Sequence, residues 1–263
     1  MSVPYDLPHA VAGLLVGFLV GLTGVGGGSL MTPLLVLMFG VSPATAVGTD
    51  LLYAAITKIA GSAVHGFRAT VDWAIVRRLA AGSVPAALVT LAVMARAGHP
   101  APATGKIMLT LLGVMLILTA IATLFQARLA DLARRIARGR PDPTGGRPAQ
   151  LTVALGALLG IAVTLSSVGA GAIGVTALLM LYPALRVSRI VGSDIAHAVP
   201  LTLVAGAGHW FIGDVNGVLL GNLLIGSIPG VIAGSLLSSR SPDHVLRPAL
   251  AAVLVISGVR LLA

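Results

Sequence analysis

A chain of 263 residues with 57% hydrophobic and only 10% charged side chains has too little polar surface to cover a soluble globule of its size. The net charge of +9 does not indicate nucleic acid, because six arginines are concentrated in the segment 128–149. The absence of cysteine excludes disulfides and thiolate metal sites, and no cofactor is indicated. Composition therefore predicts an all-α polytopic membrane protein.

The chain begins with an apolar segment, 9–40, that a glycine-rich stretch interrupts at 24–28. Helices over 9–23 and 29–39 would be roughly 22 and 16 Å long, and half the hydrocarbon core is roughly 15 Å thick. We therefore predict a broken, re-entrant helical hairpin that turns near the membrane midplane. No Lys or Arg precedes it, so a cleavable signal peptide is not expected.

Three transmembrane helices are predicted after this hairpin, and a second hairpin with three more helices after the arginine-rich segment. The predicted helices are 51–64, 79–95, 107–126, 190–213, 218–237 and 245–262, with the second hairpin at 150–183. The predicted organisation is a first repeat over 1–127, a linker over 128–149 and a second repeat over 150–263. The linker's arginines favour a cytoplasmic position beside anionic lipid.

The two halves read as copies of one another, 143 to 144 residues apart. The first copy contains, in order, Gly21, the 23–28 break, Gly48-Thr49-Asp50, His65 and Gly82-Ser83-Val84-Pro85. The second copy contains, in the same order, Thr164, the 166–171 break, Gly192-Ser193-Asp194, His209 and Gly226-Ser227-Ile228-Pro229. Duplication with broken helices at matching positions is typical of secondary transporters, and the breaks indicate where the substrate binds.

The copies are predicted to be inverted relative to each other, because a hairpin without net crossing leaves three crossings per copy. This arrangement places 13 of the 17 Lys and Arg residues in the cytosol and both termini outside, as the positive-inside rule favours.

Each break starts a new helix whose first N–H groups lack partners and whose dipole contributes partial positive charge. Two such ends meeting at the midplane would form an anion site without a fixed positive charge. The predicted substrate-binding residues are Thr23, Gly26, Gly27, Gly28, Ser29, Ser166, Ser167, Gly169, Gly171 and Ala172. Close helix packing is the alternative reading of the glycines; it suits Gly13, Gly17 and Gly21 but not three consecutive glycines.

Ionisable side chains inside the apolar segments indicate coupling or gating. The residues concerned are Asp50, Lys58, Asp194 and His197, with the hydroxyl residues Thr49 and Ser193 that precede the two aspartates. One hypothesis is a proton relay or gate. The other is that they join helices, with Asp50 paired to Lys58 and Asp194 to His197. His65 and His209 are interpreted as interfacial histidines.

The order of these motifs resembles the TauE/SafE family of sulfite-exporter-like membrane proteins. The resemblance rests on the glycine-rich break followed by Pro33, the Gly48-Thr49 step, Thr70-Val71-Asp72-Trp73 and Gly82-Ser83-Val84-Pro85 with its second copy. It implies export of small sulfur oxyanions or sulfonates across the bacterial cytoplasmic membrane. It covers the chain apart from the arginine-rich linker, and Asp72 is matched by Asn216 in the second copy.

The sequence is compatible with three classes of function. The first is an anion transporter that works by alternating access, with protons and the lipid bilayer as further partners. The second is a passive channel or an assembly subunit, and a homo-oligomer fits any of these readings. The third is an intramembrane enzyme in which Ser166 or Ser167 would act with His197 or His209, although no nucleophile motif is visible.

Overall fold

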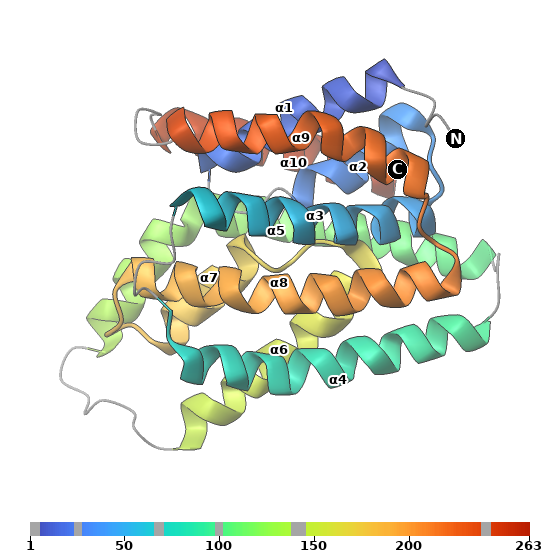
Figure 1. The fold of residues 1–263 in the computed structure, drawn as a ribbon. Helices are drawn as coiled ribbons and strands as arrows, with labels where there is room; N and C mark the ends of the chain where they lie inside the picture. Colours follow the sequence, from blue (N-terminus) through green and yellow to red (C-terminus); the bar gives the residue numbers. More distant parts are fainter. Residues whose placement is uncertain (1–5, 24–27, 66–70, 98–101, 138–145, 238–242) are drawn as a thin grey trace.

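The computed structural model describes residues 6–23, 28–65, 71–97, 102–137, 146–237 and 243–263, and the regular elements assigned there are all α-helices. They are α1 (Leu7–Thr23), α2 (Gly28–Phe39), α3 (Pro43–His65), α4 (Trp73–Ala97), α5 (Pro102–Ala137), α6 (Gly146–Ser166), α7 (Ala172–Leu181), α8 (Val187–Ile212), α9 (Gly217–Leu237) and α10 (Asp243–Leu262). Figure 1 shows these helices lying side by side in one bundle.

Each of the six predicted helices is present as a helix, and α3, α4 and α5 are clearly longer than expected. α3 begins at Pro43 because Ser42 caps it: the Thr45 N–H donates to Ser42 Oγ at 3.3 Å, and proline suits the first helical position. α5 continues to Ala137, so the described beginning of the predicted linker is helical.

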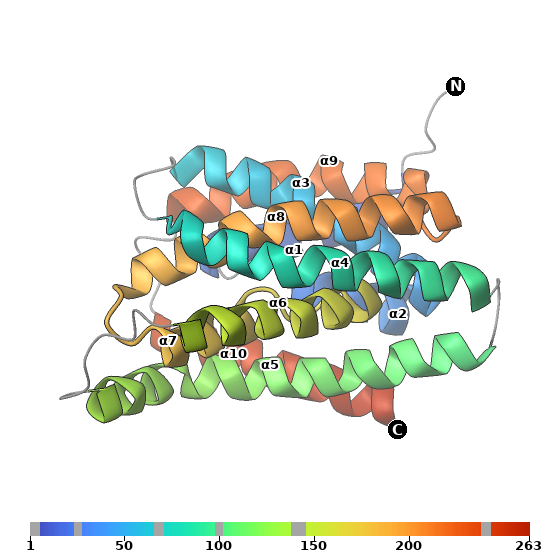
Figure 2. The ribbon, with the colours of Figure 1, turned by 90° about the horizontal axis from the view of Figure 1, so that it is seen from below.

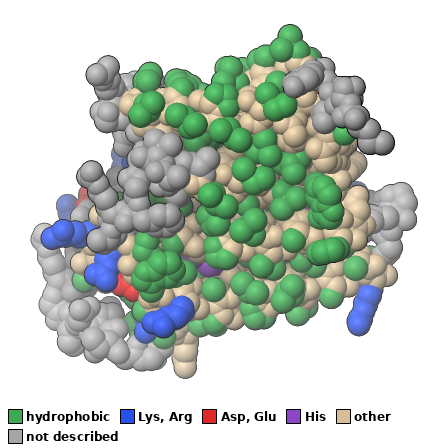
Figure 3. Space-filling view, in the orientation of Figure 1, with side chains coloured by type: hydrophobic (Ala, Val, Ile, Leu, Met, Phe, Trp, Pro, Cys, Tyr) green, Lys and Arg blue, Asp and Glu red, His purple; other side chains and the backbone are tan. Residues whose placement is uncertain are grey.

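Among the described residues, five helices are long and apolar enough to cross a membrane: α4, the 105–126 part of α5, the 148–166 part of α6, α8 and α9. Figure 3 shows hydrophobic side chains over the middle of one face, with Lys and Arg toward the two ends of the bundle. The chain is therefore a polytopic helical membrane protein. α6, with 21 residues, is longer than a half-membrane arm requires, whereas α7 has only 10.

Glycine stripes let two pairs of helices pack with their backbones in contact. A Cβ on Gly17 of α1 would lie 2.6 Å from the carbonyl oxygen of Ser227 in α9, and one on Gly13 would lie 2.1 Å from that of Leu223. The packing interpretation of Gly13, Gly17 and Gly21 is therefore confirmed. α6 packs on α4 in the same way, as Figures 1 and 2 show.

The α6–α4 contact repeats the α1–α9 contact 143 to 144 residues later. A Cβ on Gly160 would lie 2.4 Å from the carbonyl oxygen of Ser83, just as a Cβ on Gly17 would lie close to that of Ser227. Each sequence half thus contributes one helix to each of the two tight pairs. The pair α5–α10 and the pair α3–α8 also join the two halves.

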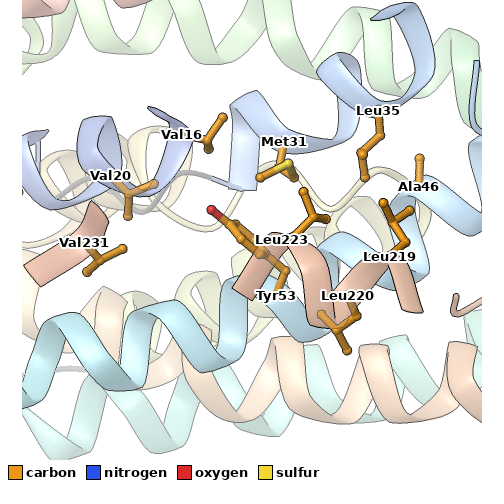
Figure 4. Packing of buried hydrophobic residues seen from close by; sticks show 10 residues of the cluster. All are labelled: Val16, Val20, Met31, Leu35, Ala46, Tyr53, Leu219, Leu220, Leu223 and Val231. Atoms are coloured by element: carbon orange, nitrogen blue, oxygen red, sulfur yellow. The ribbon is translucent and has the colours of Figure 1, made fainter. Parts of the chain in front are cut away.

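Tyr53 of α3 anchors the hydrophobic cluster shown in Figure 4, which brings α1, α2, α3 and α9 together. Its side chain is fully buried beside Met31 and Leu223, and its hydroxyl accepts a 2.8 Å hydrogen bond from Ser227 Oγ. The tyrosine supplies apolar area and satisfies its one polar atom within the packed interior. This cluster fixes the start of α2, and thereby one side of the first break.

Candidate functional site

The second break lies between Ser166, the last residue of α6, and Ala172, the first of α7. Its backbone takes left-handed conformations at Ser167 (φ 59°), Gly169 (φ 130°) and Gly171 (φ 128°). The two glycines are explained by these angles, which L side chains rarely adopt. Ser166 Oγ accepts from the Val168 N–H at 3.2 Å and so stabilises the turn.

The first break separates Thr23, the end of α1, from Gly28, the start of α2. Gly26 and Gly27 lie outside the described residues, so their predicted role is untested. Thr23 Oγ1 donates a 2.8 Å hydrogen bond to the carbonyl oxygen of Leu19 in its own helix. Ser29 follows in the first turn of α2.

One pocket, the break pocket, is lined by residues from both breaks. Its lining residues are Val20, Thr23, Ser29, Leu30, Thr119, Thr123, Gln126, Val168, Gly169, Ala170, Ala172, Leu246, Arg247, Leu250 and Leu254. Its volume of about 60 Å³ suffices for a few water molecules or a small anion. Of the predicted binding residues, Thr23, Ser29, Gly169 and Ala172 line this pocket together, whereas Ser166, Ser167 and Gly171 are not among its lining residues.

The other wall of the break pocket comes from α5 and α10, which sequence reasoning did not assign to the site. Gln126 Oε1 accepts a 3.3 Å hydrogen bond from an Arg247 guanidinium nitrogen. Thr119 is 5% exposed, and its hydroxyl has no hydrogen-bond partner among the described residues. The pocket thus differs from the expected site without fixed charge, because Arg247 lines it.

Two buried carboxylates lie at the starts of the two half-helices α2 and α7. Asp50 Oδ2 accepts a 3.2 Å hydrogen bond from the Thr32 N–H and another from the Thr32 hydroxyl. The Asp194 carboxylate interacts with the Gly171 N–H and lies so close to Gly174 that a Cβ there would be 2.3 Å from Oδ1. Each aspartate therefore faces the positive end of a helix dipole.

Lys58 lies within electrostatic range of both carboxylates, Asp50 on its own helix and Asp194 on α8. Asp194 is not hydrogen-bonded to His197 in the described structure, which differs from the helix-joining hypothesis. Instead, His197 Nε2 lies 2.8 Å from Ser83 Oγ of α4. The Asp50 carboxylate also interacts with the Ser167 side chain of the second break, whereas Asp194 Oδ1 and His197 Nδ1 have no hydrogen-bond partner among the described residues.

Thr49 and Ser193, the hydroxyl residues before the aspartates, make equivalent contacts between the two halves. Thr49 Oγ1 accepts from the Asn216 N–H at 3.2 Å, and Ser193 Oγ accepts from the Asp72 N–H at 2.8 Å. Asp72 also forms an ion pair with Arg189 at 3.2 Å. These contacts give both hydroxyls a structural role beside the predicted coupling role.

His209, interpreted from the sequence as an interfacial histidine, is fully buried within the bundle. Its Nε2 donates to the carbonyl oxygen of Thr164 at 2.9 Å, and its Nδ1 lies 3.0 Å from Asp214 Oδ2. Thr164 lies in the last turn of α6, where helix carbonyls lack partners within the helix. His209 therefore holds the end of the broken helix. The side chain of its counterpart, His65, lies outside the described residues.

The serine–histidine pairs of the enzyme hypothesis do not form in the described structure. Ser166 Oγ donates to its own helix at the carbonyl oxygen of Ala162, 2.6 Å away, and the Ser167 side chain interacts with the Asp50 carboxylate. Both histidines bond elsewhere, as described above. Within the part of the chain that the structure describes, neither serine is therefore paired with a histidine that could activate it as a nucleophile.

A family model described as "Sulfite exporter TauE/SafE" matches residues 9–261. The chain belongs to the TauE/SafE family. It is 40% identical to the "Probable membrane transporter protein YjnA" of Bacillus subtilis (strain 168) over 254 residues, which cover 95% of this chain and 97% of the relative. A shorter similarity, 39% identity over 69 residues, links it to the "Probable membrane transporter protein YunE" of the same organism, covering 26% of this chain and 25% of that protein. No solved structure matches the chain. A TauE/SafE protein with this relative is a membrane transporter.

Proposed function

We propose that this TauE/SafE protein is a secondary transporter that moves small anions, sulfite or organosulfonates, out across the bacterial cytoplasmic membrane by alternating access. The break pocket is the observation that carries the proposal. Residues on both sides of it come from helix breaks 143 to 144 residues apart in the sequence, with Ser29 from one and Ala172 from the other. Broken helix ends around a pocket are the means by which transporters hold an ion inside a membrane.

An inverted repeat is part of this proposal, with a re-entrant hairpin at the start of each half. Two kinds of equivalent contact support it. The close packing of Gly17 against Ser227 recurs between Gly160 and Ser83. The hydrogen bond between Thr49 and Asn216 recurs between Ser193 and Asp72. Each contact joins one half to the other with the partners exchanged. This is the pattern expected of a pseudo-two-fold axis.

The moving bodies would not be the two sequence halves, because the tightest backbone contacts connect the halves. We propose that one body contains α1, α9 and α3, and that the other contains α4, α6 and α8. Separating the sequence halves would break both glycine-lined helix pairs, whereas these two bodies keep each pair intact. The break pocket would open and close as the bodies rock.

Protons would couple to the anion through Asp50 and Asp194. An ionised carboxylate and a substrate anion would compete for the positive end of each half-helix, because like charges repel strongly in a buried site. Protonation removes the competing charge, so a proton and an anion would occupy the protein together. Lys58, which faces both carboxylates, compensates their charge when the site is empty.

Counterflow in liposomes tests the function directly. Vesicles containing the purified protein and preloaded with unlabelled sulfite or methanesulfonate should transiently accumulate radiolabelled substrate, and uptake should saturate. A channel would equilibrate the label without accumulating it. An enzyme would convert the substrate, which chromatography of the vesicle contents would reveal. Absence of protein-dependent flux for these anions would refute the proposal.

A further inference from the structure

The break pocket has a single charged wall. Among its described lining residues, Arg247 is the only side chain with a formal charge, and none of them is a carboxylate. The Arg247 guanidinium donates a hydrogen bond to Gln126 Oε1, a neutral acceptor on the same wall. A pocket of this composition favours an anion over a zwitterion or a cation.

Neutral donors lie on the same wall. Thr119, Thr123 and Gln126 line the pocket from α5, and the buried Thr119 hydroxyl has no hydrogen-bond partner among the described residues. A buried hydroxyl without a partner is costly unless a ligand or water completes it. The unsatisfied donor therefore indicates an oxygen-bearing ligand beside the guanidinium.

We infer that Arg247 selects the charge of the transported anion in the break pocket, while Thr119 and Gln126 recognise its oxygens without reading its charge. This inference rests on the proposed function and deepens it. A guanidinium presents two parallel N–H groups that fit two oxygens of one oxyanion, and its charge favours a dianion over a monoanion of equal shape.

The pocket's position fits this role. Gln126 is the last residue of the apolar part of α5, and Arg247 lies near the start of α10, so this wall reaches the end of the membrane-crossing region. Thr23 and Ser29 lie on the opposite wall, at the first break. An anion entering past Arg247 would therefore meet the fixed charge before it reaches the half-helix ends. Arg247 has no cationic counterpart in the first copy, where the matching position is Ala103.

The test compares sulfate with methanesulfonate, tetrahedral anions of similar size that differ by one charge. Affinities would be measured by isothermal titration calorimetry for the parent protein, Arg247→Gln, Arg247→Lys and Gln126→Leu. The matched control is Arg260→Gln, which removes an exposed arginine from the other end of the same helix. Arg247→Gln should weaken sulfate binding by about 10- to 100-fold, the usual range for a hydrogen bond to a charged group, and methanesulfonate binding by clearly less.

Arg247→Lys should keep most of the preference for the dianion, because lysine carries the same charge although it lacks the two parallel N–H donors of the guanidinium. Gln126→Leu should weaken the binding of sulfate and of methanesulfonate to a similar degree. If Arg247 had only a structural role, Arg247→Gln would weaken the binding of both anions equally. The ratio of the sulfate affinity to the methanesulfonate affinity therefore separates the two roles. An unchanged ratio in Arg247→Gln would overturn the inference and leave the proposed function standing. Failure of the parent protein to bind or transport any sulfur oxyanion or sulfonate would refute both.

Discussion

The Asp50 carboxylate accepts a 3.2 Å hydrogen bond from the backbone N–H of Thr32, near the start of the half-helix α2. The position that the sequence predicts for a substrate anion thus has a protein carboxylate beside it. Asp194 holds the corresponding place at the start of α7. This relationship links substrate binding to the protonation of the two aspartates, and it leads to the first prediction.

Asp50→Asn and Asp194→Asn should flatten the pH dependence of anion binding. In the parent protein, affinity should fall as pH rises, because ionised carboxylates repel the anion from the helix ends. An amide carries no charge, so each variant should bind the anion more tightly than the parent at high pH, by about tenfold. Calorimetric affinities over a range of pH check this. Identical pH profiles for parent and variants would leave the aspartates with a structural role only.

Gly17→Val and Gly169→Val should have different effects, because one glycine packs helices and the other lines the break pocket. A valine side chain at position 17 would clash with the Ser227 backbone in the α1–α9 contact. Gly17→Val should therefore lower stability, by about 1–3 kcal/mol or more, and leave affinity intact in the folded fraction.

Gly169 has φ 130° and lies on the pocket wall, so Gly169→Val should abolish anion binding in a protein that still inserts. Fluorescence-detected gel filtration and binding measurements separate the two outcomes. Parent-like affinity in a folded Gly169→Val protein would argue that the anion binds elsewhere.

His209→Phe should destabilise the protein, because it leaves the Thr164 carbonyl at the end of α6 without its 2.9 Å hydrogen bond. The expected cost is about 1–3 kcal/mol, measured as a lower unfolding temperature in detergent. His209→Gln, which keeps a donor, is the matched variant and should recover part of the loss. Equal stability of the Phe variant and the parent would show that this hydrogen bond contributes little.

The topology can be tested in single-cysteine variants, because the chain has no native cysteine. A cysteine at Ser2 or Ala263 should react with an impermeant thiol reagent added outside intact cells, whereas one at Thr144 should not. The expectation rests on the concentration of arginines in the linker. Labelling at Thr144 but not at the termini would reverse the predicted orientation.

The helices and the breaks could be predicted from the sequence because both depend on local pattern. The length of an apolar segment predicts a membrane-crossing helix. Glycine predicts the second break, because the backbone takes positive φ at Gly169 and Gly171. α3 extends beyond its predicted start because Ser42 caps it, a local signal that does not depend on apolar length.

The charged wall of the break pocket could not be predicted in the same way. Arg247 and Gln126 are 121 residues apart and meet only because α10 packs on α5. The charge pattern predicts on which side of the membrane most Lys and Arg residues lie, which concerns topology and says nothing about the neighbours of any one side chain. The hydrogen bond of His209 could not be predicted for a similar reason, since its carbonyl partner, Thr164, lies 45 residues away in another helix.

The central claim, that the anion binds between the two breaks, is tested most directly by substrate protection of single cysteines in the purified protein. Ser29→Cys places a thiol in the break pocket, and Ser188→Cys places one at an exposed position outside it as the control. Methanesulfonate at a concentration that saturates transport should slow thiol modification at position 29 several-fold and leave position 188 unchanged. Equal modification rates at position 29 with and without the saturating anion would contradict the claim.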